Sequence, residues 1–184
     1  MLKQNGPIHK KFQEKIKELE TQDTRWYVAK ETINFITKYI KDNFSETKVR
    51  VLEIGSHVGY SALHLGLVAN EILTIEKDKW WAQKAKKNCE FMNNIQVIEG
   101  NVLDILPTLK GKNEFEIIFI DAKKNQYKKY LELCLPLLKK GGVIFADNTI
   151  SHKDRLKEFF DELKNMNLDF KELGIADGLV VIKR

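Results

Sequence analysis

Short runs of aliphatic and β-branched residues alternate with amphipathic helical patterns along most of this chain. The apolar runs predict strands over residues 49–54, 71–76, 95–99, 115–121, 142–147, 168–174 and 178–183. Apolar residues at three- and four-residue spacing predict helices between them over residues 60–69, 78–92, 102–110, 125–139 and 153–166. Because strands that alternate with helices form βαβ units, we expect an α/β fold: a Rossmann-like, doubly wound sheet of seven mostly parallel strands with helices on both faces.

Two further amphipathic helices are predicted ahead of the first strand, from Pro7 to Glu20 and from Trp26 to Asn43. No repeat, low-complexity tract or linker interrupts the pattern that follows. A chain of 184 residues is long enough to bury about 70% of its unfolded surface in one core. We therefore predict a single domain over 1–184, in which 1–45 supplies N-terminal helices and 46–184 the Rossmann-like core.

Composition and charge narrow the range of partners. Neither a signal-peptide pattern nor an apolar run of about 18 residues occurs, so we expect a cytoplasmic protein with no membrane partner. The net charge of +5 comes from 31 basic and 26 acidic residues that are interleaved, which leaves an anionic or RNA partner open. Cys89 and Cys134 lack metal-ligand spacing, which argues against a zinc or redox site.

A glycine turn follows the first predicted strand. This strand ends in Glu53 and Gly55, Gly59 comes four residues later, and a helical pattern opens at Ser61. Glycines let the backbone approach a ligand closely, the start of a helix offers free N–H groups to an anion, and Glu53 can accept from an ammonium or hydroxyl group. The spacing predicts a ligand-binding turn, although it also occurs in other α/β proteins and differs from the Gly-x-Gly-x-x-Gly pattern of dinucleotide-binding proteins.

Several side chains near this turn are candidate ligand contacts. His57 and Tyr60 lie within the turn, and Ser61 either binds a carboxylate or caps the helix. Glu76 follows Gly55 by 21 residues at the end of the next predicted strand. A carboxylate at that place can bind both hydroxyls of a ribose, or it is simply a solvated residue at a strand end.

Two carboxylates and an amide follow the fourth and fifth predicted strands. Asp121 ends one of these strands, and Asp147 and Asn148 end the other. Oxygen donors that converge from neighbouring strand ends suit an octahedral Mg²⁺ ion. Without a cation the two carboxylates would repel, and one would take up a proton. The alternative is structural: Asp147 and Asn148 start a turn, and Asp121 caps the next helix.

Three segments of the chain resemble a known family. Residues 51–55 (VLEIG), 119–127 (FIDAKKNQY) and 141–148 (GGVIFADN) are similar to class I S-adenosylmethionine-dependent, metal-dependent O-methyltransferases, the family of catechol and caffeoyl-CoA O-methyltransferases. The resemblance runs from about Ala29 to Gly178. It implies Mg²⁺ or another divalent cation at Asp121, Asp147 and Asn148, with Lys124 as general base. It implies S-adenosylmethionine at Glu53, Gly55, His57, Gly59, Tyr60, Ser61, Glu76, Gly100, Asn101 and Asp121.

The methyl acceptor is less well defined. On the resemblance it is a small hydroxylated aromatic of the catechol type, chelated by the metal. The chain departs from the catechol enzymes at Lys123, which replaces an aromatic gate residue, and at Ser151 and His152, which replace a proline wall. Trp26 and Tyr27 either replace part of that wall or belong to the core. Family members often form a homodimer, which stays open here.

Three alternatives accompany this interpretation. In the lysine-rich segment that contains it, Lys124 is either the base or a solvated lysine. The chain could instead methylate a hydroxylated wobble uridine of tRNA, with phosphates held by Lys110, Lys112, Lys123, Lys128 and Lys139. It could also be a cofactor-binding module that lacks catalysis, since fold alone does not determine function.

Overall fold

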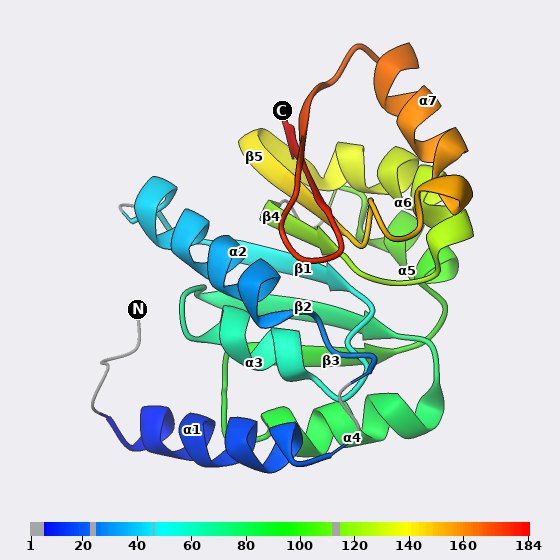
Figure 1. The fold of residues 1–184 in the computed structure, drawn as a ribbon. Helices are drawn as coiled ribbons and strands as arrows, with labels where there is room; N and C mark the ends of the chain where they lie inside the picture. Colours follow the sequence, from blue (N-terminus) through cyan, green and yellow to red (C-terminus); the bar gives the residue numbers. More distant parts are fainter. Residues whose placement is uncertain (1–5, 23–24, 46, 112–114) are drawn as a thin grey trace.

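A computed structural model describes residues 6–22, 25–45, 47–111 and 115–184 (Figure 1). Its seven-stranded sheet has the order β3-β2-β1-β4-β5-β7-β6. The strands are β1 Arg50–Ile54, β2 Glu71–Glu76, β3 Ile95–Glu99, β4 Phe115–Ile120, β5 Leu138–Asp147, β6 Asp169–Leu173 and β7 Leu179–Lys183. Strands β1 to β5 are parallel, and β7 runs antiparallel between β5 and β6. The predicted doubly wound α/β fold is confirmed.

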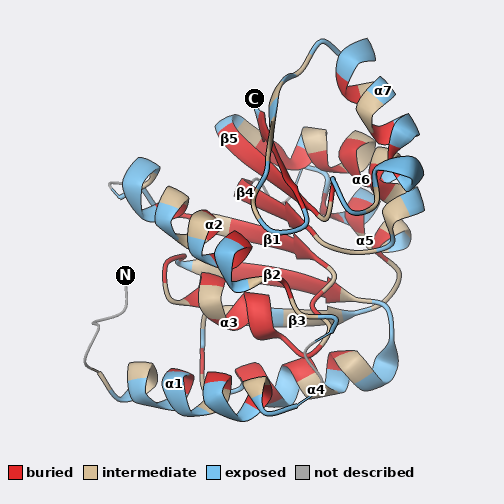
Figure 2. Ribbon diagram, viewed as in Figure 1, coloured by how far each residue is buried: buried red, intermediate tan, exposed pale blue. Residues whose placement is uncertain are grey.

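Helices cover both faces of the sheet (Figure 1). They are α1 Pro7–Glu20, α2 Lys30–Asn43, α3 Tyr60–Gly66, α4 Lys79–Cys89, α5 Val102–Leu109, α6 Tyr127–Cys134 and α7 Lys157–Asn165. Neighbouring strand residues point to opposite faces, so Val51 packs in a cluster with α1, α2 and α3, whereas Leu52 packs in a second cluster with α5, α6 and α7. Figure 2 shows that the sheet and the inward faces of these helices hold most of the buried residues.

The segment between α1 and α2 differs from the prediction. The second helix begins at Lys30, after Ala29 as N-cap, and not at Trp26. The ring of Tyr27 stacks on that of Tyr60 with 5.0 Å between the centroids, and this tertiary contact replaces the helical turn that the local pattern predicted. The described residues 25–29 therefore form an irregular segment ahead of α2.

The predicted helix 125–139 is also wrong in its extent. Helix α6 ends at Cys134, and a 3₁₀ turn, Leu135–Leu137, leads into β5, which begins four residues before the predicted position 142. Pro136 explains the end of the helix, because proline has no N–H and disfavours a helical residue before it. A register shift in the β4–β5 pairing, between Phe115 and Ile117, accommodates the longer strand.

The carboxyl ends of β1, β2, β4 and β5 meet at one edge of the sheet. The strand order reverses between β1 and β4, which is where ligands bind in open α/β sheets. At this edge the N–H of Gly55 bonds the carbonyl of Ile75, and the N–H of Asp121 bonds that of Ile54. The glycine turn and the predicted metal residues are therefore neighbours. None of the described helices is long and apolar enough to cross a bilayer.

Candidate active site

The glycine turn is shaped by the end of strand β4. Gly55 has φ +95°, a conformation that favours glycine, and a Cβ atom there would lie 2.2 Å from the carbonyl oxygen of Asp121. Gly59 has φ +87°, and its Cβ would lie 2.8 Å from the sulfur of Cys89. Both positions exclude a side chain. The turn is therefore fixed against β4 on one side and α4 on the other.

Glu76 holds the same turn from strand β2. Its carboxylate accepts hydrogen bonds from the backbone N–H of His57 at 2.8 Å and from that of Asp78 at 2.9 Å, one on each oxygen. A carboxylate offers about four lone-pair sites, so two remain for a ligand. Glu76 is thus placed to bind a diol at the mouth of the turn.

A cavity of about 250 Å³ opens above the turn. Seven of the predicted cofactor residues line it: Gly55, His57, Tyr60, Ser61, Glu76, Asn101 and Asp121. Three do not. Gly59 caps α3 below the turn, and the N–H of Gly100 bonds the carbonyl of Glu76 at 2.8 Å. The third, Glu53, has no exposed surface and accepts from the hydroxyl of Thr74 at 2.6 Å.

The burial of Glu53 has an electrostatic consequence. Loss of hydration raises its pKa to about 7, against the opposing effect of hydrogen bonds from Ser61 and Thr74. Thr74 bonds one carboxylate oxygen of Glu53, and the other is buried without a hydrogen-bond partner among the described residues. Glu53 lies beneath the turn and outside the cavity lining, and its predicted contact with the ligand stays a prediction.

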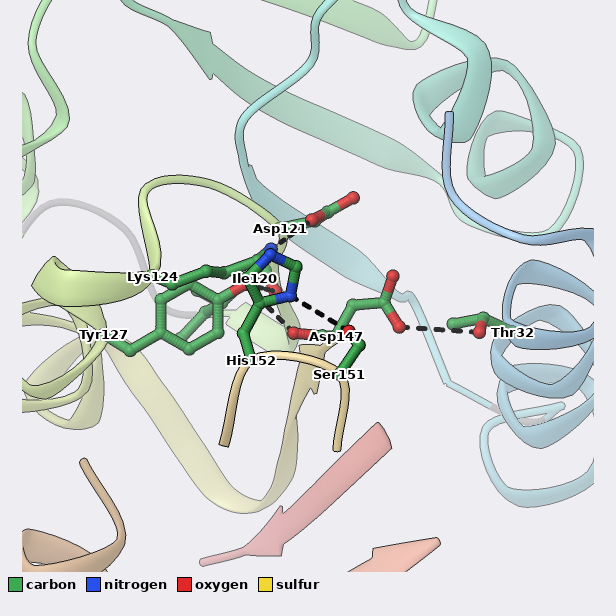
Figure 3. A network of polar contacts seen from close by, with 8 residues as sticks. All are labelled: Thr32, Ile120, Asp121, Lys124, Tyr127, Asp147, Ser151 and His152. Atoms are coloured by element: carbon green, nitrogen blue, oxygen red, sulfur yellow. Dashed lines mark hydrogen bonds and ion pairs between the residues drawn. The ribbon is translucent and has the colours of Figure 1, made fainter. Parts of the chain in front are cut away.

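A network of polar contacts joins the ends of β4 and β5 (Figure 3). The ammonium nitrogen of Lys124 lies 2.9 Å from a carboxylate oxygen of Asp121 and 2.8 Å from the hydroxyl of Tyr127. That hydroxyl lies 3.2 Å from the carbonyl oxygen of Ile120 and 3.1 Å from that of Asp147. Burial raises the pKa of Tyr127 well above its usual value, which keeps the hydroxyl protonated as a donor. Tyr127 thus ties the two strand ends together.

Asp147 is almost fully buried, with 1% of its surface exposed. One carboxylate oxygen lies 3.5 Å from the hydroxyl of Thr32 in α2, and the other has no hydrogen-bond partner within the described part of the chain. Burial first, and then the charge of Asp121, raises the pKa of Asp147 to about 7. The negative charge of Asp121 thus adds to burial in favouring the protonated form of Asp147.

A second cavity, of about 510 Å³, adjoins the first. Asp121, Lys124 and Asn148 line it, whereas Asp147 lies outside its lining. Asn148 has φ +59°, a left-handed conformation that asparagine tolerates. Backbone bonds from the N–H groups of the next three residues to the carbonyls of Gly178 and Asp177 hold this turn in place. The two cavities share Asp121, so a group bound in one lies beside a group bound in the other.

Comparison with known proteins now decides the family. A family model described as O-methyltransferase matches residues 8–179. This chain belongs to the O-methyltransferase family.

Individual members of the family show different degrees of similarity. A catechol O-methyltransferase from Niastella koreensis is 35% identical over 108 residues, which are 54% of this chain and 49% of that relative. This chain thus spans about half the length of that catechol O-methyltransferase. A caffeoyl-CoA O-methyltransferase from Populus kitakamiensis is 29% identical over 164 residues, covering 73% of this chain and 69% of the relative. A crystal structure of an O-methyltransferase from Bacillus cereus in complex with SAH shares the fold, with a TM-score of 0.78 at 20% identity over 95% of this chain and 91% of that one.

The donor set of this family member fits a divalent cation. A buried carboxylate oxygen of Asp147 lacks a partner among the described residues, and Asp121 adds a second carboxylate to the same network. Oxygen donors of this kind suit a hard ion such as Mg²⁺. No group of three or more His, Cys, Asp and Glu side chains suited to a metal occurs within residues 6–22, 25–45, 47–111 and 115–184. The predicted metal set would not be found by such a search, because only Asp121 and Asp147 are of these four types and its third member is an asparagine, Asn148.

The sequence reasoning missed several residues of this O-methyltransferase. Tyr127 stands three residues after Lys124 at the start of α6, a spacing that could have linked them. Trp81 contacts the ring of His57 with 3.8 Å between the centroids and lines the second cavity. Trp26 and Tyr27, predicted either as wall or as core, line both cavities. No sequence pattern links Thr32 to Asp147, because 115 residues separate them.

Proposed function

We propose that this protein transfers a methyl group from S-adenosylmethionine to a hydroxyl of a small, catechol-like aromatic acceptor. Mg²⁺ or another divalent cation is bound by Asp121, Asp147 and Asn148. The observation that carries the proposal is the pair of adjoining cavities that share Asp121, one above the glycine turn and one beside Lys124. Membership of the O-methyltransferase family supports the reaction type.

The first cavity is suited to the cofactor. Gly55 lets the backbone approach the amino-acid part of a ligand, and Glu76 offers its two free lone-pair sites to ribose hydroxyls. His57 and Tyr60 add aromatic surface beside the turn. These residues would hold the cofactor in place before any acceptor binds, which is the proximity contribution of an enzyme to a two-substrate reaction.

The second cavity is suited to the acceptor. When bound, S-adenosylmethionine supplies the methyl group, and the divalent cation lowers the pKa of an acceptor hydroxyl. Lys124, in its neutral form, is placed to take the proton of that hydroxyl. The ammonium group that results donates to Asp121 and to the hydroxyl oxygen of Tyr127, at the 2.9 and 2.8 Å separations of the structure. These two partners stabilise the protonated product of the transfer.

The lysines named for the tRNA alternative differ in their surroundings: Lys110 and Lys123 are exposed, and neither is ion-paired with a described residue. Lys128 is ion-paired with Glu162 at 3.1 Å and Lys139 with the buried Glu116, so a phosphate would compete with a carboxylate for each. Lys112 lies outside the described residues. The homodimer and the cytoplasmic location stay predictions.

A stepwise experiment tests the proposal. Calorimetric titration with S-adenosylmethionine measures cofactor binding in the first cavity. Methyl transfer to a panel of catechols, with Mg²⁺ and again with excess EDTA, measures turnover of the acceptor in the second. We expect cofactor binding in both conditions and turnover only with Mg²⁺. Cofactor binding without metal-dependent turnover of any catechol would instead support the non-catalytic module, and equal turnover in EDTA would remove the metal from the proposal.

A further inference from the structure

The acceptor cavity has an unusual distribution of charge. Its wall is aromatic, from Trp26, Tyr27 and Trp81, and its lining includes four cationic side chains against two acidic ones. The cationic residues are Arg25, Lys123, Lys124 and Arg155, and the acidic ones are Asp121 and Asp177. A cavity for a neutral catechol needs the aromatic wall and the metal residues, and it has no use for the additional positive charge.

Two of these cations have no ionic partner in the part of the chain that the structure describes. Lys124 is paired with Asp121 at 2.9 Å, which neutralises both. Lys123 and Arg155 are exposed, and neither makes a side-chain hydrogen bond or an ion pair with any described residue. Asp177 is the remaining acidic group in the lining, and His152 contacts Ser151 at 2.9 Å.

Both free cations stand on fixed backbone at the edge where the strands end. Lys123 follows β4, and its carbonyl accepts from the N–H of Gln126 at 2.9 Å to open a 3₁₀ turn, Lys124–Gln126. Arg155 ends another 3₁₀ turn, Lys153–Arg155, and the residue after it, Leu156, has no exposed surface. The two backbones are thus held in place while both side chains line the cavity, so an anion bound there would not have to order the backbone that carries the two charges.

We infer that the acceptor carries an anionic substituent, a carboxylate or a phosphate, and that Lys123 and Arg155 bind it. This inference rests on the proposed function, since it concerns the acceptor of the same reaction. Arginine binds such groups through two parallel N–H bonds, and lysine acts as a point charge. Neither residue belongs to the proposed metal set or acts as the proposed base, so we assign both to acceptor specificity and not to the proton transfer.

Three acceptors that differ only in charge test the inference. They are 3,4-dihydroxybenzoate, the neutral 3,4-dihydroxybenzamide and the cationic 3,4-dihydroxybenzylamine, each assayed with S-adenosylmethionine and Mg²⁺. We expect kcat/KM to be about tenfold higher for the benzoate than for the benzamide, and lowest for the benzylamine. This preference should weaken as salt is added, because exposed charges are screened.

Charge-removing variants locate the preference. Lys123→Gln and Arg155→Gln should each lower kcat/KM for the benzoate, through KM, about fivefold more than they lower it for the benzamide. Arg155→Lys keeps the charge and loses the two-bond geometry, so it should lose less of the benzoate preference than Arg155→Gln does. Lys164→Gln is the matched control, because Lys164 is an exposed lysine of α7 that lies outside the cavity lining. Equal kcat/KM for the three acceptors, or equal losses for benzoate and benzamide in the variants, would overturn the inference.

Binding measured without turnover separates this inference from the proposed function. The three compounds are titrated by calorimetry into protein that holds S-adenosylhomocysteine and Mg²⁺. Charge-selective binding without methyl transfer would leave the inference standing and contradict the function, whereas turnover of all three at equal rates would do the reverse. If tRNA is bound and methylated and none of the three compounds binds, the inference is wrong.

Discussion

The two halves of the candidate site are built by different means. Around the first cavity the decisive contacts involve backbone: a Cβ atom excluded at Gly55 by the carbonyl of Asp121, and N–H groups of His57 and Asp78 that bond Glu76. Around the second cavity they involve side chains, as in the contacts of Lys124 with Asp121 and Tyr127 (Figure 3). We therefore expect substitutions that create a steric conflict to impair the cofactor half most, and substitutions that remove a charge to impair the acceptor half most.

The largest effect should follow a change of shape in the cofactor half. In Gly55→Ala the new methyl group would meet the Asp121 carbonyl at 2.2 Å, at φ +95°. The left-handed conformation costs about 1–2 kcal/mol and the overpacking about 1–3 kcal/mol more. The same displacement of the turn should lower kcat/KM roughly 100-fold. Chemical denaturation and cofactor titration measure the two losses.

Gly141→Ala is the matched control for this variant. Gly141 has φ +79°, but a Cβ atom there would meet nothing within 4 Å. It should therefore show the conformational cost of about 1–2 kcal/mol alone, with S-adenosylmethionine affinity unchanged. Equal stability losses in the two variants would mean that the contact with strand β4 does not shape the turn.

The backbone-built half is also the half that the sequence predicts well. The fold follows from the alternation of strand and helix patterns along the chain. The positions of Gly55, Gly59 and Glu76 follow from their spacing, because each lies at or just after the end of a predicted strand. The full burial of Glu53 did not follow, because its contact with Thr74 becomes visible only once the register of the two strands is known. The sequence places Glu53 correctly at the turn, but it does not show whether the side chain lies in the cavity above the turn or is buried beneath it.

The side-chain-built half was only partly predictable. Asp121, Asp147 and Asn148 could be grouped because parallel strands share one edge for their carboxyl ends. For Tyr27 the sequence left wall and core open, and it gave no signal for Thr32, because the position of this segment over the sheet is set by long-range packing, such as the stacking of Tyr27 on Tyr60. Contacts of this kind leave no periodicity in the sequence.

A change of charge without change of shape should disable the acceptor half. Asp147→Asn keeps the size of the side chain and removes a proposed metal-binding charge. Loss of the cation's contribution of several kcal/mol corresponds to a fall in Mg²⁺-dependent kcat/KM on the order of 1000-fold. The metal-free variant should be at least as stable as the native protein, because it no longer buries a carboxylate.

Asp177→Asn provides the control for Asp147→Asn. Asp177 lines the acceptor cavity, but it is exposed and lies outside the proposed metal set, so the same loss of charge should change Mg²⁺ affinity little. Calorimetric titration with Mg²⁺ and steady-state kinetics compare the two variants. An unaltered Mg²⁺ affinity in Asp147→Asn would contradict the assignment of this carboxylate.

The pH dependence of stability sharpens the same comparison. Because the pKa of Asp147 is raised to about 7, the native state keeps a proton that the unfolded state has released above about pH 4. The free energy of unfolding of the metal-free protein therefore falls as pH rises through this window, relative to Asp147→Asn. The difference between the two proteins should change by at most about 1.4 kcal/mol per pH unit.

Comparison with the variant isolates Asp147 from other groups. Burial raises the pKa of Glu53 to about 7, which acts in the same direction, and burial lowers the pKa of His64 to about 4, which acts in the opposite one. Both are present in the two proteins and cancel in the difference. Urea denaturation of both proteins between pH 4 and 8 in EDTA measures this difference in the free energy of unfolding. A difference that does not change with pH would show that the pKa of Asp147 is not raised.

The smallest effect concerns the contact that crosses the greatest distance in sequence. Thr32 is fully buried, and its hydroxyl lies 3.5 Å from a carboxylate oxygen of Asp147. Thr32→Val keeps the shape and removes the donor, so Mg²⁺ affinity should fall roughly threefold, as for a weak hydrogen bond. Thr32→Ser keeps the donor and removes a buried methyl, so it should lose about 1 kcal/mol of stability and keep its Mg²⁺ affinity. Weaker Mg²⁺ binding in the serine variant than in the valine variant would show that packing by α2, and not its hydroxyl, positions Asp147.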